Sequence, residues 1–552
     1  MKKMAEKTEL KQIQDALLSD NYELAEWMLQ DYLTKTELYD DMTAIFDAAL
    51  GRYYKDWKRV WSAVRRGLMH NCRNYELYLM LGEYCLQNNP CQSYLCYENA
   101  LFYCNDLEDQ EEIRKLLYEM EAVHKIHVNK TAILIQSCDA LEQTRLCIKS
   151  IHMTTPESAR EIVIADHGIK EAMAEVPEKA DILFLSDDTL LTENALFWLR
   201  MGLYDRKENG AAGSVTNTGQ DRYPQIAEGV SDASDLFVFG EQTNIPWKYP
   251  YEMQIFLSGF ALLVRRAVIE QAGLPEESLG DLKYEDFGLR LSAEGYQNVL
   301  CKNSFIIKTK KQHVGCEENL SEERRKIDEK WGFHTKYYLG VRRDLPGLIM
   351  EPEEQPLHVL EIGCGCGAVL AYIKSLHPNA EVYGVELISE VAKIAVHFGN
   401  VLCGDVEQMD YPWEEEFFDY IIMGDVLEHL SNPELVLRKL RKHLRTGGHI
   451  LISMPNVKHY SVLLPLICQD IFPYSDSGIL DRTHVKMYTG TEIKNLIWKS
   501  GYEIEAMGGH LYGVPGEKEQ QMIDILTRLM EEPSRESFMV YQYVVKATKR
   551  QV

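Results

Sequence analysis

The chain has 552 residues, of which 45% are hydrophobic and 26% charged, so it is long enough for several globular domains with buried cores. Its formal net charge of -26 disfavours nucleic acid and anionic membrane surfaces as partners, because both would repel the chain. The 13 cysteines are odd in number and irregularly spaced, which predicts reduced thiols rather than a disulfide framework and hence a cytoplasmic protein.

Secretory and membrane-spanning segments are not expected. The N-terminal stretch "MKKMAEKTELKQIQ" carries two early lysines, but no apolar segment of signal-peptide type follows it. No apolar run approaches the roughly 20 residues that a membrane-spanning helix needs. We therefore expect no membrane span.

Residues 1–126 show helical apolar spacing and few strand signals. Three similar segments, "NYELAEWMLQDYL", "DWKRVWSAVRRGL" and "CQSYLCYENALFY", begin at Asn21, Asp56 and Cys91, a period of 35 residues. Helix pairs at this period, with aromatic and small residues on the packed face, resemble tetratricopeptide-type repeats. A plain helical bundle explains the pattern nearly as well, because the glycine and alanine positions of that repeat are only partly present. In either case we expect an all-α domain that docks a protein partner.

Residues 127–338 change to short apolar strands that alternate with helices, which predicts a parallel sheet. Ligands bind beyond the carboxyl ends of the strands in such sheets, and Asp166, Asp187 and Asp188 follow two of the expected strands. The adjacent carboxylates in "LFLSDDT" repel each other unless a cation or hydrogen-bond donors compensate. This pair predicts a metal or ligand site, although an isolated Ser-Asp-Asp is also a common helix cap.

The order of the motifs in this region resembles the A-type fold glycosyltransferases of family 2 over about 200 residues. "IVIADHG" and "FLSDDT" resemble that family's nucleotide-binding and metal-binding strand ends, and "YEDFGLRLSAEGY" resembles its catalytic helix start. The resemblance implies inverting transfer of a sugar from a nucleotide-sugar donor, with a divalent metal, Mn²⁺ or Mg²⁺. The residues that it implies are Asp286 as base with Glu285 second, Asp188 and His313 on the metal, and Asp139, Asp166 and Asp187 on the nucleotide sugar.

Two departures from that family's pattern bear on the reaction. The first strand reads "IQSCD", where the family usually has proline followed by a hydroxyl, an aromatic and an asparagine residue, so Asp139 lacks the expected motif around it. The chain also has no Gln-x-x-Arg-Trp motif, which the processive synthases of the family carry. We therefore expect addition of a single sugar rather than synthesis of a polymer.

Residues 339–552 begin with an acidic, proline-containing linker and continue with "HVLEIGCGCGAVL". Gly363, Gly365 and Gly367 lie directly after a strand and before a helix, where the backbone must turn tightly and approach a ligand closely. A dinucleotide-binding loop has similar glycines, so the neighbouring motifs decide the ligand. Glu386 ends the next strand in "VYGVE", where it would hold ribose hydroxyls.

The order of these motifs, followed by "CGDVEQM", "FDYIIMGDVLEHL" and "LRTGGHILISMPN", resembles class I S-adenosylmethionine-dependent methyltransferases over about 190 residues. The resemblance implies a Rossmann-like α/β domain that binds S-adenosylmethionine. The cofactor-binding residues that it implies are Glu361, Gly363, Gly365, Gly367, Glu386, Asp405 beside the adenine, and Asp425.

The segment "SGILDRTHVKMYT" resembles a motif of small-molecule and sugar O-methyltransferases. The resemblance implies that Asp481 and His484 face the methyl acceptor, and His484 would take the hydroxyl proton because imidazole titrates near neutral pH. The alternative is that His484 only orders this loop. We expect His429, in "VLEHL", to cap or pack near the cofactor.

Together these motifs predict a bifunctional cytoplasmic enzyme with an all-α, tetratricopeptide-like domain, a glycosyltransferase domain and a methyltransferase domain. One sugar would be attached to a protein or glycan acceptor, which the helical domain would dock, and the glycan would then be O-methylated. A first alternative is a methyltransferase whose middle domain only binds a glycan. A second is an assembly scaffold in which the repeat-like helices recruit partners.

Overall fold

The computed structural model describes residues 2–36, 38–137, 141–218, 226, 232–309, 317–531 and 534–550. It divides the chain into two compact units, Met1–Ile327 and Asp328–Val552. The expected further division of the first unit near residue 126 stays a prediction.

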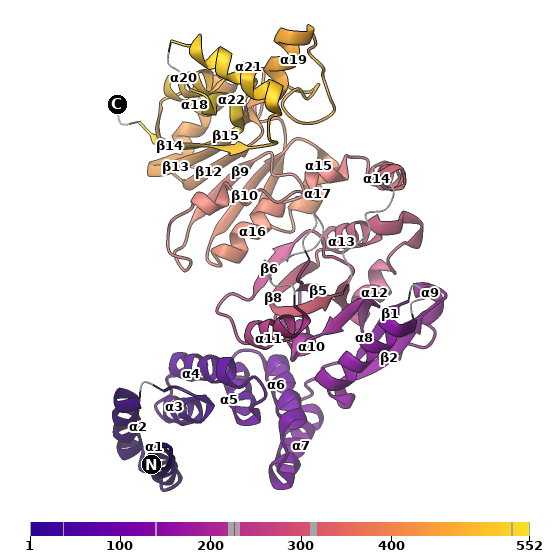
Figure 1. The fold of residues 1–552 in the computed structure, drawn as a ribbon, viewed down its shortest axis with the longest axis vertical. Helices are drawn as coiled ribbons and strands as arrows, with labels where there is room; N and C mark the ends of the chain where they lie inside the picture. Colours follow the sequence, from indigo (N-terminus) through magenta and orange to yellow (C-terminus); the bar gives the residue numbers. More distant parts are fainter. Residues whose placement is uncertain are drawn as a thin grey trace. The chain divides into compact units, whose positions relative to one another are not determined.

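The first unit begins with seven helices (Figure 1). They are α1 (Lys2–Leu18), α2 (Tyr22–Thr36), α3 (Asp41–Tyr53), α4 (Trp57–His70), α5 (Tyr75–Leu86), α6 (Pro90–Tyr103) and α7 (Leu107–Ala122). Five of them begin after an Asp or Asn whose side chain accepts a hydrogen bond from a first-turn backbone N–H: Asp40, Asp56, Asn74, Asn89 and Asp106. The three similar sequence segments fall on α2, α4 and α6, so the period of 35 residues corresponds to one helix pair. The N-terminal region is therefore helical, and its assignment to the tetratricopeptide class stays a prediction.

An eight-stranded sheet follows in the order β2-β1-β3-β7-β5-β8-β4, with β6 paired to β8. Its strands are β1 (Thr131–Gln136), β2 (Arg160–Ala165), β3 (Asp181–Ser186), β4 (Thr189–Leu191), β5 (Asn209–Val215), β6 (Tyr251–Gln254), β7 (Ala261–Val264) and β8 (Gln297–Lys308). The expected parallel pairing is confirmed for β2-β1-β3 and for β5 with β8. It is wrong for β4, β6 and β7, which run antiparallel to their neighbours, so the sheet is mixed.

Helices cover both faces of this sheet. They are α8 (Leu141–Thr154), α9 (Ile169–Ala172), α10 (Ala195–Leu203), α11 (Ala233–Thr243), α12 (Arg266–Ala272) and α13 (Lys283–Ala293), with 3-10 turns at Glu157–Ala159 and Glu277–Leu282 and with α14 (Glu317–Trp331) following. Side chains along β1 alternate between the two faces, as a strand requires. Ile133 and Ile135 belong to one apolar core, and Ala132 and Leu134 belong to the core on the other face.

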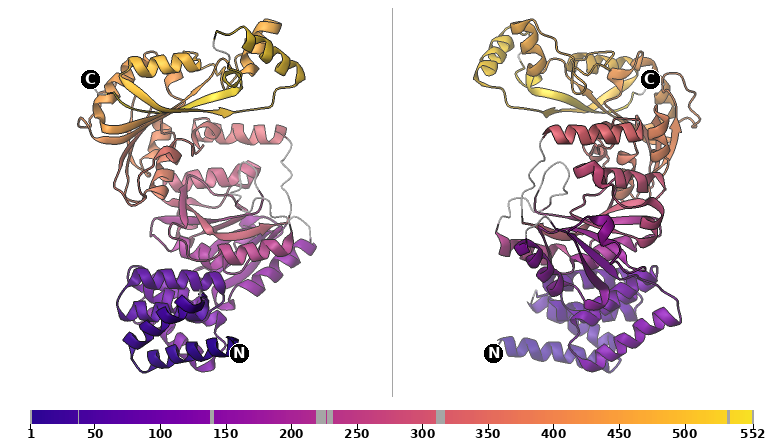
Figure 2. Two further views of the ribbon diagram at one scale, coloured as in Figure 1. Left: turned by 60° about the vertical axis from the view of Figure 1, so that its left-hand side comes forward. Right: turned by 90° about the vertical axis from the view of Figure 1, so that its right-hand side faces the viewer.

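The N-terminal helices share one of these two cores with the sheet. The cluster that contains Ile133 also contains Leu95 of α6 and Tyr78 of α5. Tyr78 packs edge-on against Phe197 of α10, with ring centroids 5.4 Å apart. Helices α6 and α10 lie side by side in the two further views (Figure 2). The helical segment is therefore part of the first unit's core.

The second unit contains a seven-stranded sheet in the order β11-β10-β9-β12-β13-β15-β14. Its strands are β9 (His358–Ile362), β10 (Glu381–Glu386), β11 (Asn400–Cys403), β12 (Phe418–Gly424), β13 (Leu444–Pro455), β14 (Tyr502–Leu511) and β15 (Val540–Lys549). The first five strands pair in parallel, whereas β15 runs antiparallel to both β13 and β14. The expected closing strand "FMVYQYVVKAT" is confirmed as β15, which begins at Val540.

The helices of the second unit connect and cover these strands. They are α15 (Thr335–Tyr338), α16 (Ala368–Leu376), α17 (Ser389–Ala395), α18 (Pro433–His443), α19 (Tyr460–Gln469), α20 (Gly490–Lys499), α21 (Glu517–Arg528) and α22 (Glu536–Met539), with 3-10 turns η3 (Pro346–Leu348) and η4 (Leu427–His429). Strands that alternate with helices around a mainly parallel sheet form a Rossmann-like fold. The expected α/β class of this region is therefore confirmed.

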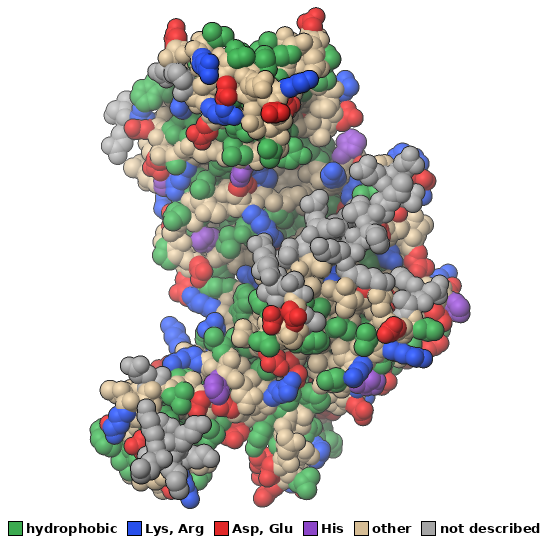
Figure 3. All heavy atoms as spheres, in the orientation of Figure 1, with side chains coloured by type: hydrophobic (Ala, Val, Ile, Leu, Met, Phe, Trp, Pro, Cys, Tyr) green, Lys and Arg blue, Asp and Glu red, His purple; other side chains and the backbone are tan. Residues whose placement is uncertain are grey.

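On the face that Figure 3 shows, acidic and basic side chains are interspersed. Among the described residues, no helix combines the length and the apolar composition needed to cross a bilayer.

Candidate functional site

The loop between β9 and α16 has the backbone conformation that its glycines permit. Gly363, Gly365 and Gly367 have φ values of 72°, 55° and 86°, which lie in the left-handed region that favours glycine. A side chain at Gly365 would also meet the carbonyl oxygen of Tyr338 at 3.0 Å from its Cβ. The loop therefore turns tightly at the carboxyl end of the central strand, as the sequence predicted, and its backbone N–H groups from Gly363 to Gly367 donate within the protein.

Glu386, at the end of β10, closes this loop. Its Oε2 accepts a hydrogen bond from the backbone N–H of Gly365 at 2.9 Å, and its Oε1 accepts one from the N–H of Ile388 at 3.0 Å. The carboxylate is buried, and burial raises its pKa above the usual range for glutamate. Glu386 thus fixes the glycine loop, and its expected contact with ribose hydroxyls stays a prediction.

Glu361, on β9, carries a buried carboxyl group that lacks a full set of partners. Its Oε2 has no hydrogen-bond partner among the described residues. Burial and the nearby Glu386 raise the pKa of Glu361 to about 8, while Arg342 acts in the opposite direction. A buried carboxyl oxygen without a partner favours a ligand that brings a cation or a hydrogen-bond donor. S-adenosylmethionine fits this requirement, because its methionine part carries an ammonium group and a sulfonium.

The two aspartates predicted to bind the cofactor follow β11 and β12, which are consecutive along the chain and are separated by β10 and β9 in the sheet. Asp405 follows β11 and accepts hydrogen bonds from the Glu407 N–H at 2.9 Å and from the Gln408 amide at 2.8 Å. Asp425 follows β12 with a φ of 55° and forms an ion pair with Arg342. Both carboxylates stand at the same sheet edge as the glycine loop, and their contacts with a cofactor stay predictions.

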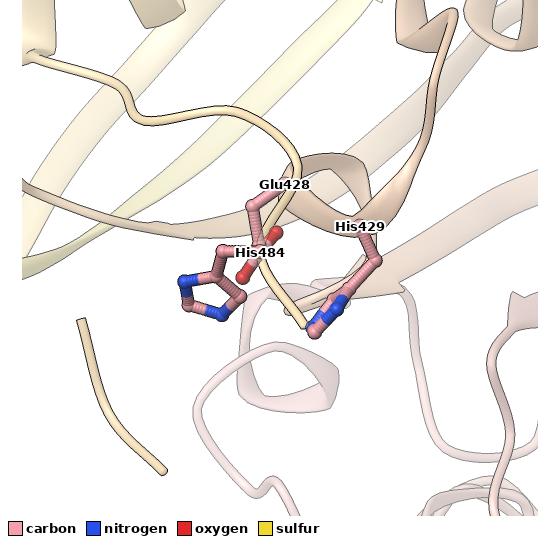
Figure 4. A group of neighbouring side chains, drawn as sticks. All are labelled: Glu428, His429 and His484. Carbon is pink, nitrogen blue, oxygen red and sulfur yellow. The ribbon is translucent and has the colours of Figure 1, made fainter. Parts of the chain in front are cut away.

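The acceptor-side residues gather beyond β12. Asp481 accepts hydrogen bonds at Oδ1 from the backbone N–H and the hydroxyl of Thr483, at 2.8 and 2.6 Å. His484 stacks edge-on against His429, with ring centroids 4.7 Å apart. Glu428, next to His429 in η4, completes the group (Figure 4). The sequence did not single out Glu428; its signal was the adjacent Glu-His pair of "VLEHL" directly after an apolar strand.

In the first unit, Asp188 has an ammonium partner. The Nζ of Lys308 donates to Asp188 Oδ1 at 2.9 Å, and the hydroxyl of Ser186 donates to the same oxygen at 2.5 Å. A divalent cation on this oxygen would have to displace the buried Lys308 side chain. The metal role of Asp188 stays a prediction, which its pairing with Lys308 does not favour.

The predicted base of the first unit is enclosed. Asp286 in α13 is fully buried and forms an ion pair with Arg290 at 2.9 Å. Glu285 is nearly as buried and pairs with Arg324 at 2.7 Å. Both carboxylates are thus held in ion pairs with guanidinium groups. Their catalytic role stays a prediction that this arrangement does not favour.

Two of the three residues predicted to bind the nucleotide sugar, Asp166 and Asp187, lie within the described part of the chain. Asp166 follows β2 and is exposed, whereas Asp187 follows β3 and is buried. Because β2 and β3 flank β1 in parallel, both aspartates stand at one edge of the sheet. Asp139 and His313 lie outside the described residues.

Comparisons with known proteins concern the second unit. A family model described as a methyltransferase domain matches residues 336–507. The mitochondrial ubiquinone biosynthesis O-methyltransferase of Rattus norvegicus is 26% identical over 168 residues, which are 28% of this chain and 47% of that protein. The malonyl-[acyl-carrier protein] O-methyltransferase of Bacillus cereus is 32% identical over 106 residues, which are 18% of this chain and 38% of that protein. The chain thus spans less than half the length of these two relatives.

The chain was also compared with solved structures. The SAM-dependent methyltransferase from Aquifex aeolicus aligns with a TM-score of 0.27 and 17% sequence identity. The alignment covers 40% of this chain and 97% of that one.

Proposed function

We propose that this chain, in which residues 336–507 form a class I S-adenosylmethionine-dependent methyltransferase domain, transfers a methyl group to an oxygen atom of a small-molecule or glycan acceptor. The choice of oxygen rests on the O-methyltransferase names of the two relatives and on the segment "SGILDRTHVKMYT". When bound, the cofactor supplies an electrophilic methyl group on a sulfonium.

One observation carries the cofactor part of the proposal. The left-handed glycine loop after β9 is closed by Glu386, and next to it Glu361 keeps a buried oxygen without a partner. In the proposed complex, Glu361 accepts from the ammonium of the methionine part, Glu386 holds the ribose hydroxyls, and Asp405 lies beside the adenine. The glycines themselves let the backbone of the loop approach the cofactor closely, because they carry no side chain there.

The acceptor part of the proposal places the oxygen nucleophile beside Asp481 and His484. An imidazole with a pKa near neutrality takes a hydroxyl proton efficiently as the methyl group is transferred. Asp481 would orient the acceptor or the adjacent histidine.

The test measures cofactor binding by calorimetry and formation of S-adenosylhomocysteine with phenols, carboxylic acids and free sugars as acceptors. Glu386→Ala removes a charged acceptor from two backbone donors and from the ribose, and each such hydrogen bond contributes about 1.5–3 kcal/mol. We expect the Kd for S-adenosylmethionine to rise by at least about tenfold. Glu390→Ala, at an exposed position in α17, is the matched control and should leave the Kd unchanged. Equal affinities in all three proteins would reject the proposed role of Glu386.

As a second function, we propose that the first unit binds a nucleotide sugar and transfers the sugar before methylation. The supporting observation is that Asp166 and Asp187 lie at one edge of the parallel β2-β1-β3 strands, where α/β sheets bind ligands. Because Lys308 pairs with Asp188, we expect its ammonium, rather than a divalent metal, to provide the positive charge near a diphosphate. The proposal includes a cytoplasmic location and docking of a protein acceptor by α1–α7.

Thermal unfolding with UDP, GDP, dTDP and CDP tests this second function. One nucleotide at a hundred times its Kd should stabilise the first unit by about 2.7 kcal/mol. The stabilisation should persist in EDTA, and a shift that requires manganese would instead restore the metal role of Asp188. If no nucleotide stabilises the chain, the alternatives remain a lone methyltransferase with a non-catalytic middle region, or an assembly scaffold.

A further inference from the structure

We infer that Glu428, His429 and His484 form a binding site for one divalent transition-metal ion, of which zinc is the representative. Each residue offers one ligand atom, and these atoms all lie within 4.8 Å of one another. Glu428 and His429 belong to η4, directly after β12, whereas His484 comes from the loop before α20. Figure 4 shows the carboxylate of Glu428 between the two imidazole rings.

The carboxyl group of Glu428 is buried without a hydrogen bond. The residue is only 1% exposed, and neither of its carboxylate oxygens has a hydrogen-bond partner among the described residues. Arg342 is near enough to act on this group through its charge, but it forms no hydrogen bond with it. Leaving a buried polar group without a hydrogen bond costs about 1–3 kcal/mol, and a metal ion between the carboxylate and the two rings would supply the missing partner.

The two histidines are oriented as metal ligands are. The Nδ1 of His429 lies 3.2 Å from the carbonyl oxygen of Thr483, and the Nδ1 of His484 lies 2.9 Å from that of Ile479. A carbonyl oxygen only accepts, so each Nδ1 carries the hydrogen and each Nε2 keeps its lone pair. Metal-binding histidines commonly donate their other ring N–H to a carbonyl or carboxylate in this way.

Backbone pairing brings His484 to the other two ligands. The N–H groups of Val485 and Lys486 both donate to the carbonyl oxygen of Glu428, at 2.9 and 3.1 Å. These bonds hold the loop against η4 without involving any of the three ligand side chains. The site is therefore preformed, and little conformational freedom is lost when an ion binds.

The ligand set indicates which ions fit. Two imidazoles and one carboxylate suit zinc and its first-row neighbours, whereas magnesium and calcium prefer oxygen ligands alone. Three protein ligands leave a fourth position of a tetrahedral zinc site open, as catalytic zinc sites do. Resting on the proposed function, a metal ion in this site would lower the pKa of an acceptor hydroxyl at the open position, and the proton released would pass to solvent water. His484 would then act as a ligand rather than as a free base.

Zinc titration of the full-length chain tests the inference. Bound metal is removed from the protein with a chelator, and the protein is then titrated calorimetrically with Zn²⁺. The parent protein carries Cys403→Ser and Cys468→Ser, because these two thiols are exposed. We expect about one ion per chain. His484→Ala and Glu428→Gln should each weaken binding by at least about 10- to 100-fold. His397→Ala, at an exposed histidine of the same unit, is the matched control and should bind as the parent does.

Other outcomes would overturn the inference. Equal zinc binding by the parent and both site variants would place the ion elsewhere, and loss of binding in the serine background alone would assign it to the exposed thiols. Thermal unfolding in chelator separates ligand loss from misfolding: Glu428→Gln keeps the shape of the side chain and should leave the Tm of the metal-free protein unchanged. Cobalt gives a further check, because its visible absorption in a tetrahedral site should disappear in His484→Ala.

Cofactor binding in the same samples separates this inference from the proposed function. A chain that binds S-adenosylmethionine but no zinc would overturn only the metal site. A chain that binds zinc at these residues but no S-adenosylmethionine would overturn only the proposed methyl transfer.

Discussion

Replacing Glu361 with glutamine is expected to remove a loss of stability that the second unit suffers as the pH rises from about 4.5 to about 8. The pKa of Glu361 is about 8 in the folded chain, because the carboxyl is buried and lies near Glu386, against about 4.5 in an unfolded chain. Between these two values the folded state binds one more proton than the unfolded state. The free energy of unfolding therefore falls with rising pH in this window and levels off above it.

The expected size of this effect is large for one residue. A difference of about 3.5 pH units corresponds to a loss of at most about 5 kcal/mol, at about 1.4 kcal/mol per unit. Glutamine has the same shape but no titrating proton, so Glu361→Gln should match the wild type near pH 4 and exceed it in stability at pH 9. Arg342 limits the effect by favouring the carboxylate.

Calorimetry of the full chain between pH 5 and 9 measures this prediction, on the transition that S-adenosylmethionine shifts. Glu503→Gln, at an exposed residue of β14, is the control and should follow the wild type at every pH. If the free energy of unfolding changed with pH in the same way for Glu361→Gln and the wild type, the raised pKa of Glu361 would be contradicted. Glu361→Gln should also bind the cofactor more weakly, because its amide lacks the charge that attracts an ammonium.

The second large effect is expected at the buried ion pair between Glu98 of α6 and Arg200 of α10. The two residues are 8% and 4% exposed, and Arg200 also donates to the carbonyl oxygen of Asn129 at 3.0 Å. Removing one partner of a buried pair leaves an uncompensated charge and costs about 3–5 kcal/mol. Glu98→Gln should therefore destabilise the first unit by about that amount, reduced in part by Asp181, whose charge also favours the Arg200 cation.

Two further variants separate charge from packing. Glu98→Leu combined with Arg200→Met removes both charges, and such replacements are often neutral or stabilising, so most of the stability should return. Glu83→Gln breaks the surface pair with Arg52, whose side chains are 36% and 53% exposed, and should cost about 1 kcal/mol or less. The free energies of unfolding are measured by denaturant titration. Equal destabilisation by Glu98→Gln and Glu83→Gln would show that the buried pair contributes no more to stability than the surface pair.

The cofactor loop was predictable because its determinants are local. Three glycines between an apolar strand and a helix permit only a tight turn, and positive φ values at Gly363, Gly365 and Gly367 confirm that expectation. Glu386 was predictable for a related reason, since the end of a parallel strand is where such a sheet places its ligands. The sequence did not show that Glu386 also accepts a hydrogen bond from the backbone of the glycine loop.

The pairing of Lys308 with Asp188 could not be predicted from local pattern. The two residues are 120 positions apart, and they meet because the short strand β4 pairs antiparallel with the end of β8, which sets Lys308 opposite Thr189. The residue spacing in "FLSDDT" does not predict that ion pair. The same applies to Glu428, whose relation to His484 depends on backbone bonds from Val485 and Lys486 across more than 50 residues.

The core shared by the helical segment and the first sheet also has a consequence for synthesis on the ribosome. Glu98 and Tyr78 leave the ribosome about 100 residues before Arg200 and Phe197, the partners that cover them. At about 5–20 residues per second, the wait is about 5–20 s. During that interval the apolar face of α5 and α6 stands open to solvent in the nascent chain. Chaperone capture is therefore most useful to this protein early in its translation, well before the second unit exists.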